Sequence, residues 1–144
     1  ARAGLADLLG GARGEEANVA ERGTGELYCG CAGAGNDGFV IHAPVDSMKP
    51  NGFGFFHLLG NVEEWCRDHY VEFSRAESEG LVWASGDGMM DLGKGKDSSR
   101  SIRGGSYQEC IHKARVSYRN HNFYDRGGRD LGFRLVRAVD VSRR

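Results

Sequence analysis

The sequence has little of what defines several common protein classes. It holds only two prolines and four cysteines in 144 residues, and its 19 basic residues nearly balance 20 acidic ones. The cysteines, Cys29, Cys31, Cys66 and Cys110, have neither the density of a disulfide scaffold nor the spacing of a zinc site. Nucleic-acid binding would need a strongly basic face, so we do not expect it. No apolar run approaches the roughly 18 residues that would span a membrane.

Glycine is what the sequence has in abundance, with 23 residues. This is about twice the usual share of roughly 7%, and no collagen-like period accompanies it. Helical periodicity is scarce, whereas short β-like runs followed by turns occur at 38–41, 102–106 and 114–118. The segment 131–137 alternates apolar and basic residues as a half-buried strand does. We therefore predict one loop-rich domain over residues 1–144, with short strands.

The N-terminal stretch, Ala1 to Leu9, has neither an initial Met nor the layout of a signal peptide. It is typical of the end of a helix whose start is missing. We therefore expect the chain to be part of a longer domain.

Several separate motifs then occur in one order along the chain. They are Ala43-Pro-Val-Asp-Ser-Met-Lys-Pro-Asn-Gly-Phe-Gly54, Leu59-Gly-Asn-Val-Glu-Glu-Trp65, Arg103-Gly-Gly-Ser-Tyr107, Arg119-Asn120 and Leu131-Gly-Phe-Arg134. In order and spacing, from about Asn18 to Val139, the chain resembles the formylglycine-generating-enzyme (sulfatase-modifying factor) family. The resemblance implies an α+β domain of C-type-lectin-like fold with little regular secondary structure. Because the family domain is longer, it also implies an N-terminal portion that is absent or on another chain.

Calcium prefers six to eight oxygen ligands, often from irregular loops. The resemblance implies a first calcium site with side-chain oxygens from Asn18 and Asp37 and carbonyl oxygens from Val19 and Phe39. Such an ion would stabilise a loop-rich fold by binding only its native state. Residue types alone favour Asn18 and Asp37 as caps of turns, and only the resemblance favours the calcium site.

The resemblance implies a second calcium site from the carbonyls of Gly60 and Val62 and the carboxylate of Glu64. His57 stands where the family has a side-chain amide ligand. Imidazole is a poor ligand for calcium, so this site departs from the family pattern.

The oxidases of the family use two closely spaced cysteines after the Gly-Gly-Ser motif to bind Cu(I), which prefers soft ligands. Cys110 is the one cysteine in that region, and residues 111–118 contain no second one. We therefore expect no oxidase activity, unless His112 or a distant cysteine replaces the missing thiol. Cys66 and Cys110 could be buried small residues or a disulfide, and Cys29 and Cys31 turn residues or a local redox pair. The alternative is a copper- or iron-dependent oxidoreductase that uses Cys110, although the five histidines show no metal-like spacing.

Binding is the remaining function. The family includes inactive paralogues and retroelement-diversified variable proteins, whose variable positions can become Asn, Tyr, Ser, Asp, His, Phe, Gly or Arg. Residues 114–132 contain no Lys, Glu, Gln, Met or Trp, and aromatics with small polar residues suit a binding surface. The candidate contact residues are Tyr107, Gln108, His112, Tyr118, Asn120, His121, Asn122, Phe123, Tyr124, Arg126, Arg129 and Asp130. The expected partner is a protein or small-molecule ligand, or the chain's own N-terminal segment; the alternative is an ordinary polar loop.

Overall fold

The computed structural model describes residues 17–20, 37–72 and 99–137, which form a small sheet with long loops at one end. The strands are β1 (Glu63–His69), β2 (Ser99–Arg103), β3 (Asn120–Phe123) and β4 (Leu131–Gly132). These described ranges contain no helix, and hence no helix long and apolar enough to cross a membrane. The loop-rich, short-stranded prediction is confirmed. The stretch Ala1 to Leu9, expected to end a helix, lies outside the described residues.

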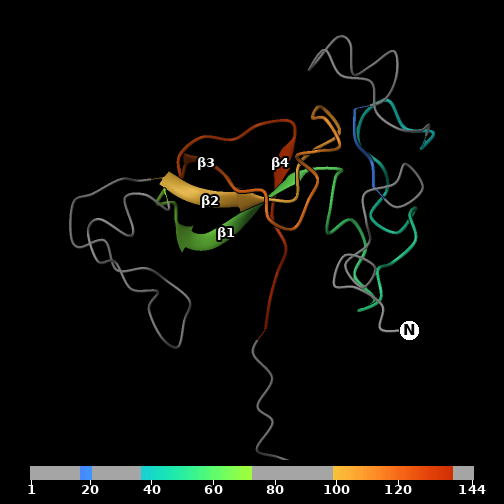
Figure 1. The fold of residues 1–144 in the computed structure, drawn as a ribbon, viewed down its shortest axis with the longest axis horizontal. Helices are drawn as coiled ribbons and strands as arrows, with labels where there is room; N and C mark the ends of the chain where they lie inside the picture. The colour runs from blue at the N-terminus through green and yellow to red at the C-terminus, as the bar shows by residue number, and fades with distance from the viewer. Residues whose placement is uncertain (1–16, 21–36, 73–98, 138–144) are drawn as a thin grey trace, which may run out of the picture.

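The sheet order is β3-β2-β1-β4. Strand β2 pairs antiparallel with both β1 and β3, whereas β4 adds to the far side of β1 in parallel. Trp65 of β1 lies opposite Ile102 of β2, a pairing of an aromatic with a β-branched residue that stabilises antiparallel strands. The register then shifts before His69, as at a β-bulge. Residues 37–60 lie beside the end of the sheet where β1 begins (Figure 1).

Within residues 17–20, 37–72 and 99–137, the main apolar cluster is small. Ala17, Val19, Leu59 and Ala114 form one buried apolar cluster, and Ile111 packs against it. So little apolar surface gives a modest hydrophobic driving force, and hydrogen bonds must therefore fix much of the loop geometry.

Two glycines allow the backbones around this core to approach closely. A Cβ at Gly60, whose φ is +79°, would lie 2.4 Å from the carbonyl oxygen of Asn18. At Gly105, with φ +71°, it would lie 3.0 Å from the amide nitrogen of Ala114. Only glycine fits both the dihedral angle and the space at these positions.

The predicted β-like runs are only partly strands. The run at 102–106 supplies the end of β2, and 131–137 supplies the two residues of β4. The run at 38–41 forms bends because Gly38 has a φ of +85° and the Ile41 carbonyl accepts a hydrogen bond from the Asn18 side chain. The run at 114–118 forms turns closed by the bonds from Ala114 N to Ile111 O and from Tyr118 N to Arg115 O.

Candidate functional site

The first predicted calcium site begins at Asn18, whose side chain is fully buried. Its Nδ2 donates to the Ile41 carbonyl at 2.6 Å and to Asn61 Oδ1 at 3.2 Å. Its Oδ1 is buried as well, yet it accepts no hydrogen bond from any described residue. A buried oxygen without a donor is costly, so a cation at this point would satisfy it.

The other half of this site lies in the loop that Asn18 holds. Asp37 Oδ1 accepts a hydrogen bond from Phe39 N at 2.8 Å, which fixes the carboxylate and the Phe39 backbone in one turn. The Asn18 to Ile41 bond ties this turn to the segment of Asn18 and Val19. The four predicted ligands are thus carried by two connected segments, and the residues present fit a calcium ion.

Asn61 is the residue that locks these segments to the sheet. Its amide accepts from Ala43 N at 2.9 Å and donates to Ala43 O at 3.1 Å. Its backbone N donates to Asn18 O at 2.6 Å, and it holds a φ of +66°. The Gly60-Asn61 pair in the sequence is the signal for such a turn, because Asn tolerates this region of φ better than other side chains.

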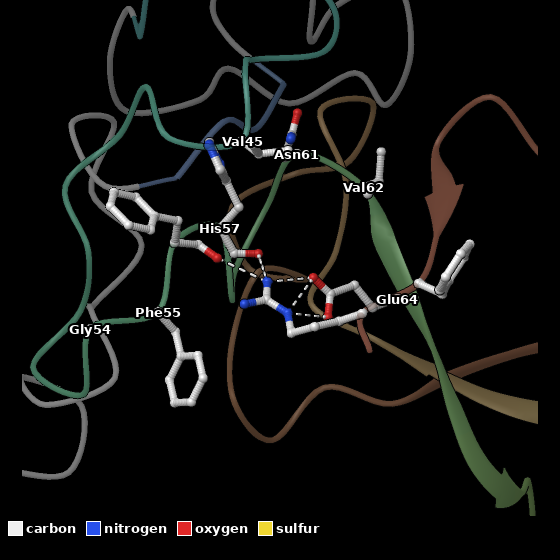
Figure 2. Close-up of a pocket in the computed structure, with 10 residues that line it drawn as sticks. Val45, Gly54, Phe55, His57, Asn61, Val62 and Glu64 are labelled. Carbon is white, nitrogen blue, oxygen red and sulfur yellow. Dashed lines mark hydrogen bonds and ion pairs between the residues drawn. The ribbon is translucent and has the colours of Figure 1, made fainter. Parts of the chain in front are cut away.

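The second predicted calcium site is arranged differently (Figure 2). Both oxygens of Glu64 accept from Arg134 Nε, at 3.1 and 3.0 Å, and Oε1 also accepts from Arg134 Nη2 at 2.6 Å. Nη2 further donates to the carbonyls of Phe56 at 2.8 Å and His57 at 3.2 Å. The guanidinium already neutralises the only carboxylate, and the hydrogen bond to Glu64 raises the pKa of Arg134. Glu64, Gly60 and Val62 therefore do not fit a second calcium ion in this arrangement.

A cavity of about 370 Å³ opens over this ion pair. Phe55, Phe133 and Val45 are among the residues that line it (Figure 2). His57 is buried, and its Nε2 lies 2.8 Å from the Pro44 carbonyl oxygen. The walls are mostly apolar, and the charges at the base are paired.

The predicted contact residues separate into a set whose side chains bond within the fold and an exposed set. Tyr107 is buried and receives a hydrogen bond from Gln108 Nε2 at 2.7 Å. Asn120 donates to Glu63 Oε1 at 3.0 Å, and Asp130 Oδ2 accepts from the fully buried Ser106 at 3.3 Å. These contacts hold the loop in place, so this set is structural in character. Tyr118 and Asn122 are half-buried.

The exposed set projects from β3 and the turn after it. Phe123 is 42% and Tyr124 68% exposed, and the Arg126 guanidinium lies 5.3 Å from the centre of the Phe123 ring. His121 stacks on Tyr70 with ring centres 4.3 Å apart. His112 and Arg129 are also exposed.

Glu63, at the start of β1, is a buried acid that the sequence reading missed. Burial raises its pKa from 4.5 to about 7; the hydrogen bond from Asn120 lowers it, while nearby Glu109 and Asp130 raise it. No three His, Cys, Asp or Glu side chains gather as metal ligands within the described ranges. Alternation along β1 could have suggested that one of the two adjacent glutamates faces inward.

The comparisons with known proteins agree with the motifs. Residues 4–139 match the family described as Sulfatase-modifying factor enzyme 1-like domain. The chain belongs to this family. It is 35% identical over 109 residues to the formylglycine-generating enzyme of Streptomyces coelicolor, covering 74% of this chain and 32% of that protein. It is 30% identical over 101 residues to the inactive C-alpha-formylglycine-generating enzyme 2 of Bos taurus, covering 69% and 28%.

The solved structure of PvdO from Pseudomonas aeruginosa is also similar to this sulfatase-modifying-factor-like chain. The TM-score is 0.61 at 26% identity, over 84% of this chain and 38% of that one. The chain spans about a third of the length of the curated relatives it matches.

Within the described residues, the two cysteines of this family member, Cys66 and Cys110, do not form a pair of free thiols. Cys110 is 6% exposed and forms a disulfide whose partner lies outside them. Cys66 is a free, half-buried thiol. A disulfide between Cys66 and Cys110, one alternative left open by the sequence, is therefore wrong. Residues 111–118, where the family pattern would have its second copper-binding cysteine, contain the buried methyl of Ala114. Cys29 and Cys31 lie outside the described residues.

Proposed function

We propose that this chain is a non-catalytic ligand- or protein-binding module of C-type-lectin-like, α+β fold. The exposed set, Phe123, Tyr124 and Arg126 together with His112, His121 and Arg129, is its contact surface. The observation that carries the proposal is the exposure of two adjacent aromatic rings with a guanidinium over one of them. Aromatic and arginine side chains are the groups that most often dominate binding interfaces.

A calcium ion held by Asn18, Val19, Asp37 and Phe39 is the structural part of the proposal. The buried, undonated Oδ1 of Asn18 supports it, because a hard cation prefers such oxygens. The ion would connect the first described segment to the loop after it, and it takes no part in any reaction.

The surface can be tested without knowing the natural ligand, by panning a random peptide library on the purified chain. We expect enriched peptides to lose binding to the Phe123→Ala/Tyr124→Ala double variant. They should still bind the Phe53→Ala/Phe55→Ala variant, which removes two other exposed rings. Peptides that bind all three proteins equally would show that the surface is elsewhere.

An oxidoreductase using Cys110 with copper or iron is the second candidate, favoured by the name of the Streptomyces coelicolor relative. Because Cys110 is buried in a disulfide, that function would require its reduction. Oxygen uptake with a cysteine-containing peptide and Cu(I) is the deciding measurement. Oxygen uptake by the parent that is lost in the Cys110→Ser variant would favour the enzyme. Oxygen uptake by the parent no greater than that of the variant would support the binding module.

A further inference from the structure

The cavity of about 370 Å³ that opens over the Glu64–Arg134 ion pair takes no part in the proposed contact surface. Its lining includes none of the exposed set on β3 and the turn after it, and neither Asn18 nor Asp37 of the predicted calcium site. Small-molecule sites have volumes of roughly 300 to 1,000 Å³. At the lower end of this range, the cavity suits one ring with a small polar substituent.

Apolar side chains form most of the wall, and the loop that carries one of them is fixed. Phe55, Phe133 and Val45 line the cavity and are at least half exposed (Figure 2). Asn51 Oδ1 accepts from Phe55 N at 3.0 Å, and Asn51 N donates to Phe55 O at 2.9 Å. The backbone of Phe55 is therefore held in place before any ligand binds. Exposed rings gain contact by packing against the ring of a ligand.

The charges of the lining cancel. Among the described residues that line the cavity, Glu64 and Arg134 are the only charged ones, and they bind each other. An ionic ligand would lose its hydration here without gaining a free counter-charge. The cavity therefore favours an uncharged molecule.

One nitrogen of the guanidinium keeps its donors. Nε and Nη2 of Arg134 donate to Glu64, and Nη2 also donates to the carbonyls of Phe56 and His57. No described residue accepts from Nη1, so its two N–H groups are available to an acceptor. The guanidinium carbon lies 6.0 Å from the centre of the Phe55 ring. An acceptor bound to Nη1 would therefore adjoin the aromatic wall.

His57 contributes an acceptor to the same cavity. It is 8% exposed, and its Nε2 lies 2.8 Å from the Pro44 carbonyl oxygen. A carbonyl oxygen only accepts, so Nε2 carries the proton and Nδ1 of the neutral ring carries a lone pair. Nδ1 is buried and receives no hydrogen bond from any described residue. Such an acceptor is costly, and an N–H group of a molecule in the cavity would satisfy it.

We propose that this cavity, here called the ion-pair cavity, binds a small, uncharged aromatic carboxamide. Its ring packs against Phe55 and Phe133. Its oxygen accepts from Arg134 Nη1, and its N–H donates to His57 Nδ1. A carboxamide has its acceptor and its donor on two different atoms, so it can serve both protein groups at once. The ion-pair cavity shares no residue with the proposed contact surface.

NMR titration of the purified chain with benzamide tests the site. We expect a dissociation constant of about 1 mM or below. Phe55→Ala should weaken binding about fivefold or more, because it removes a ring of the wall. Phe53→Ala removes the neighbouring exposed ring, which lies outside the lining, and should bind as the parent does. No binding at about 10 mM benzamide, or equal losses in the two variants, would overturn the proposal.

The hydrogen bond to His57 is tested with N,N-dimethylbenzamide, which has no N–H, at a pH of about 8, where imidazole is neutral. We expect it to bind the parent about threefold to tenfold more weakly than benzamide, the difference that one hydrogen bond makes. In His57→Phe, which keeps a ring without the acceptor, the two amides should bind equally. A preference for benzamide that persists in His57→Phe would refute this hydrogen bond. Equal binding of both amides to the parent would refute it without the variant.

The charge balance of the cavity is tested with benzoate. The parent should bind benzoate at least about tenfold more weakly than benzamide. Glu64→Gln removes the charge that neutralises Arg134, so benzoate should gain at least about tenfold in that variant. Glu72→Gln removes an exposed charge outside the lining and should leave benzoate binding unchanged. A parent that prefers benzoate would overturn the proposal. These titrations are independent of the peptide-panning test, so the two proposals can fail separately.

Discussion

Asparagine residues serve opposite purposes at the two ends of this molecule. Asn18 and Asn61 are buried and join three segments far apart in the sequence through their amides and backbones. On β3, Asn122 lies in an edge strand of the described sheet, and its Oδ1 accepts from the next residue, Phe123. The buried asparagines of the first region bond to other segments of the fold, whereas Asn122 of the second region makes a local contact with Phe123. Burial and sequence separation of the contacts, rather than residue type, distinguish scaffold from surface.

The largest effect should come from Gly60→Ala. The added Cβ would meet the Asn18 carbonyl at 2.4 Å in a backbone with φ +79°, so backbone must move. We expect a loss of more than about 3 kcal/mol in the free energy of unfolding, measured by urea denaturation. Gly127→Ala, in the surface loop with nothing within 4 Å, should change it by less than about 0.5 kcal/mol. Similar losses in both variants would contradict the close approach at Gly60.

Asn61→Ala should have the second largest effect, a loss of about 2 to 4 kcal/mol in the free energy of unfolding. It leaves Ala43 N and O without their partner and places alanine at φ +66°. Asn122→Ala removes one local contact and should cost under about 1 kcal/mol in the same denaturation experiment. A cost at Asn122 as large as that at Asn61 would abolish the distinction between the two regions.

Calcium should stabilise the first region alone. With calcium at about 100 times its dissociation constant, the gain is about 3 kcal/mol, visible as a rise in the thermal midpoint that chelation reverses. Asp37→Asn keeps an oxygen for the turn to Phe39 but removes the only carboxylate of the site, so this rise should shrink greatly. Asp46→Asn, an exposed control, should respond as the parent does. If neither calcium nor chelator changes the thermal midpoint of the parent, the predicted calcium site is wrong.

The last prediction concerns pH and Glu63, which connects the regions through Asn120. Its folded pKa of about 7 exceeds the ordinary value of 4.5, so the folded state holds its proton more tightly. Below pH 4.5 both states are protonated and the shift contributes nothing. Between pH 4.5 and 7 it lowers stability progressively, and above pH 7 the loss is constant. Glu63→Gln should therefore exceed the parent in thermal midpoint at pH 8 and match it near pH 4.5; equal midpoints at both pH values would contradict the shift.

The sequence predicted the family and the loop-rich, short-stranded character because ordered motifs and glycine turns are local signals. The strands at 38–41 and 114–118 were wrong because an Asn18 side chain and i to i+3 turn bonds compete with strand pairing. Asn18 and Asp37 could be found from the family pattern. The guanidinium at Glu64 could not, because Arg134 reaches it over 70 residues.

The parallel pairing of β1 with β4 has a consequence for the order of folding. Glu63 and Glu64 on β1 lie beside Leu131 and Gly132, and Arg134 follows directly. During synthesis, β1 therefore leaves the ribosome more than 60 residues before its partner strand and the cation of its glutamate. Contacts of such long range form late and slowly. Until then one edge of β1 stays open and Glu64 stays unpaired, a charge on a bare strand edge that discourages association with another chain.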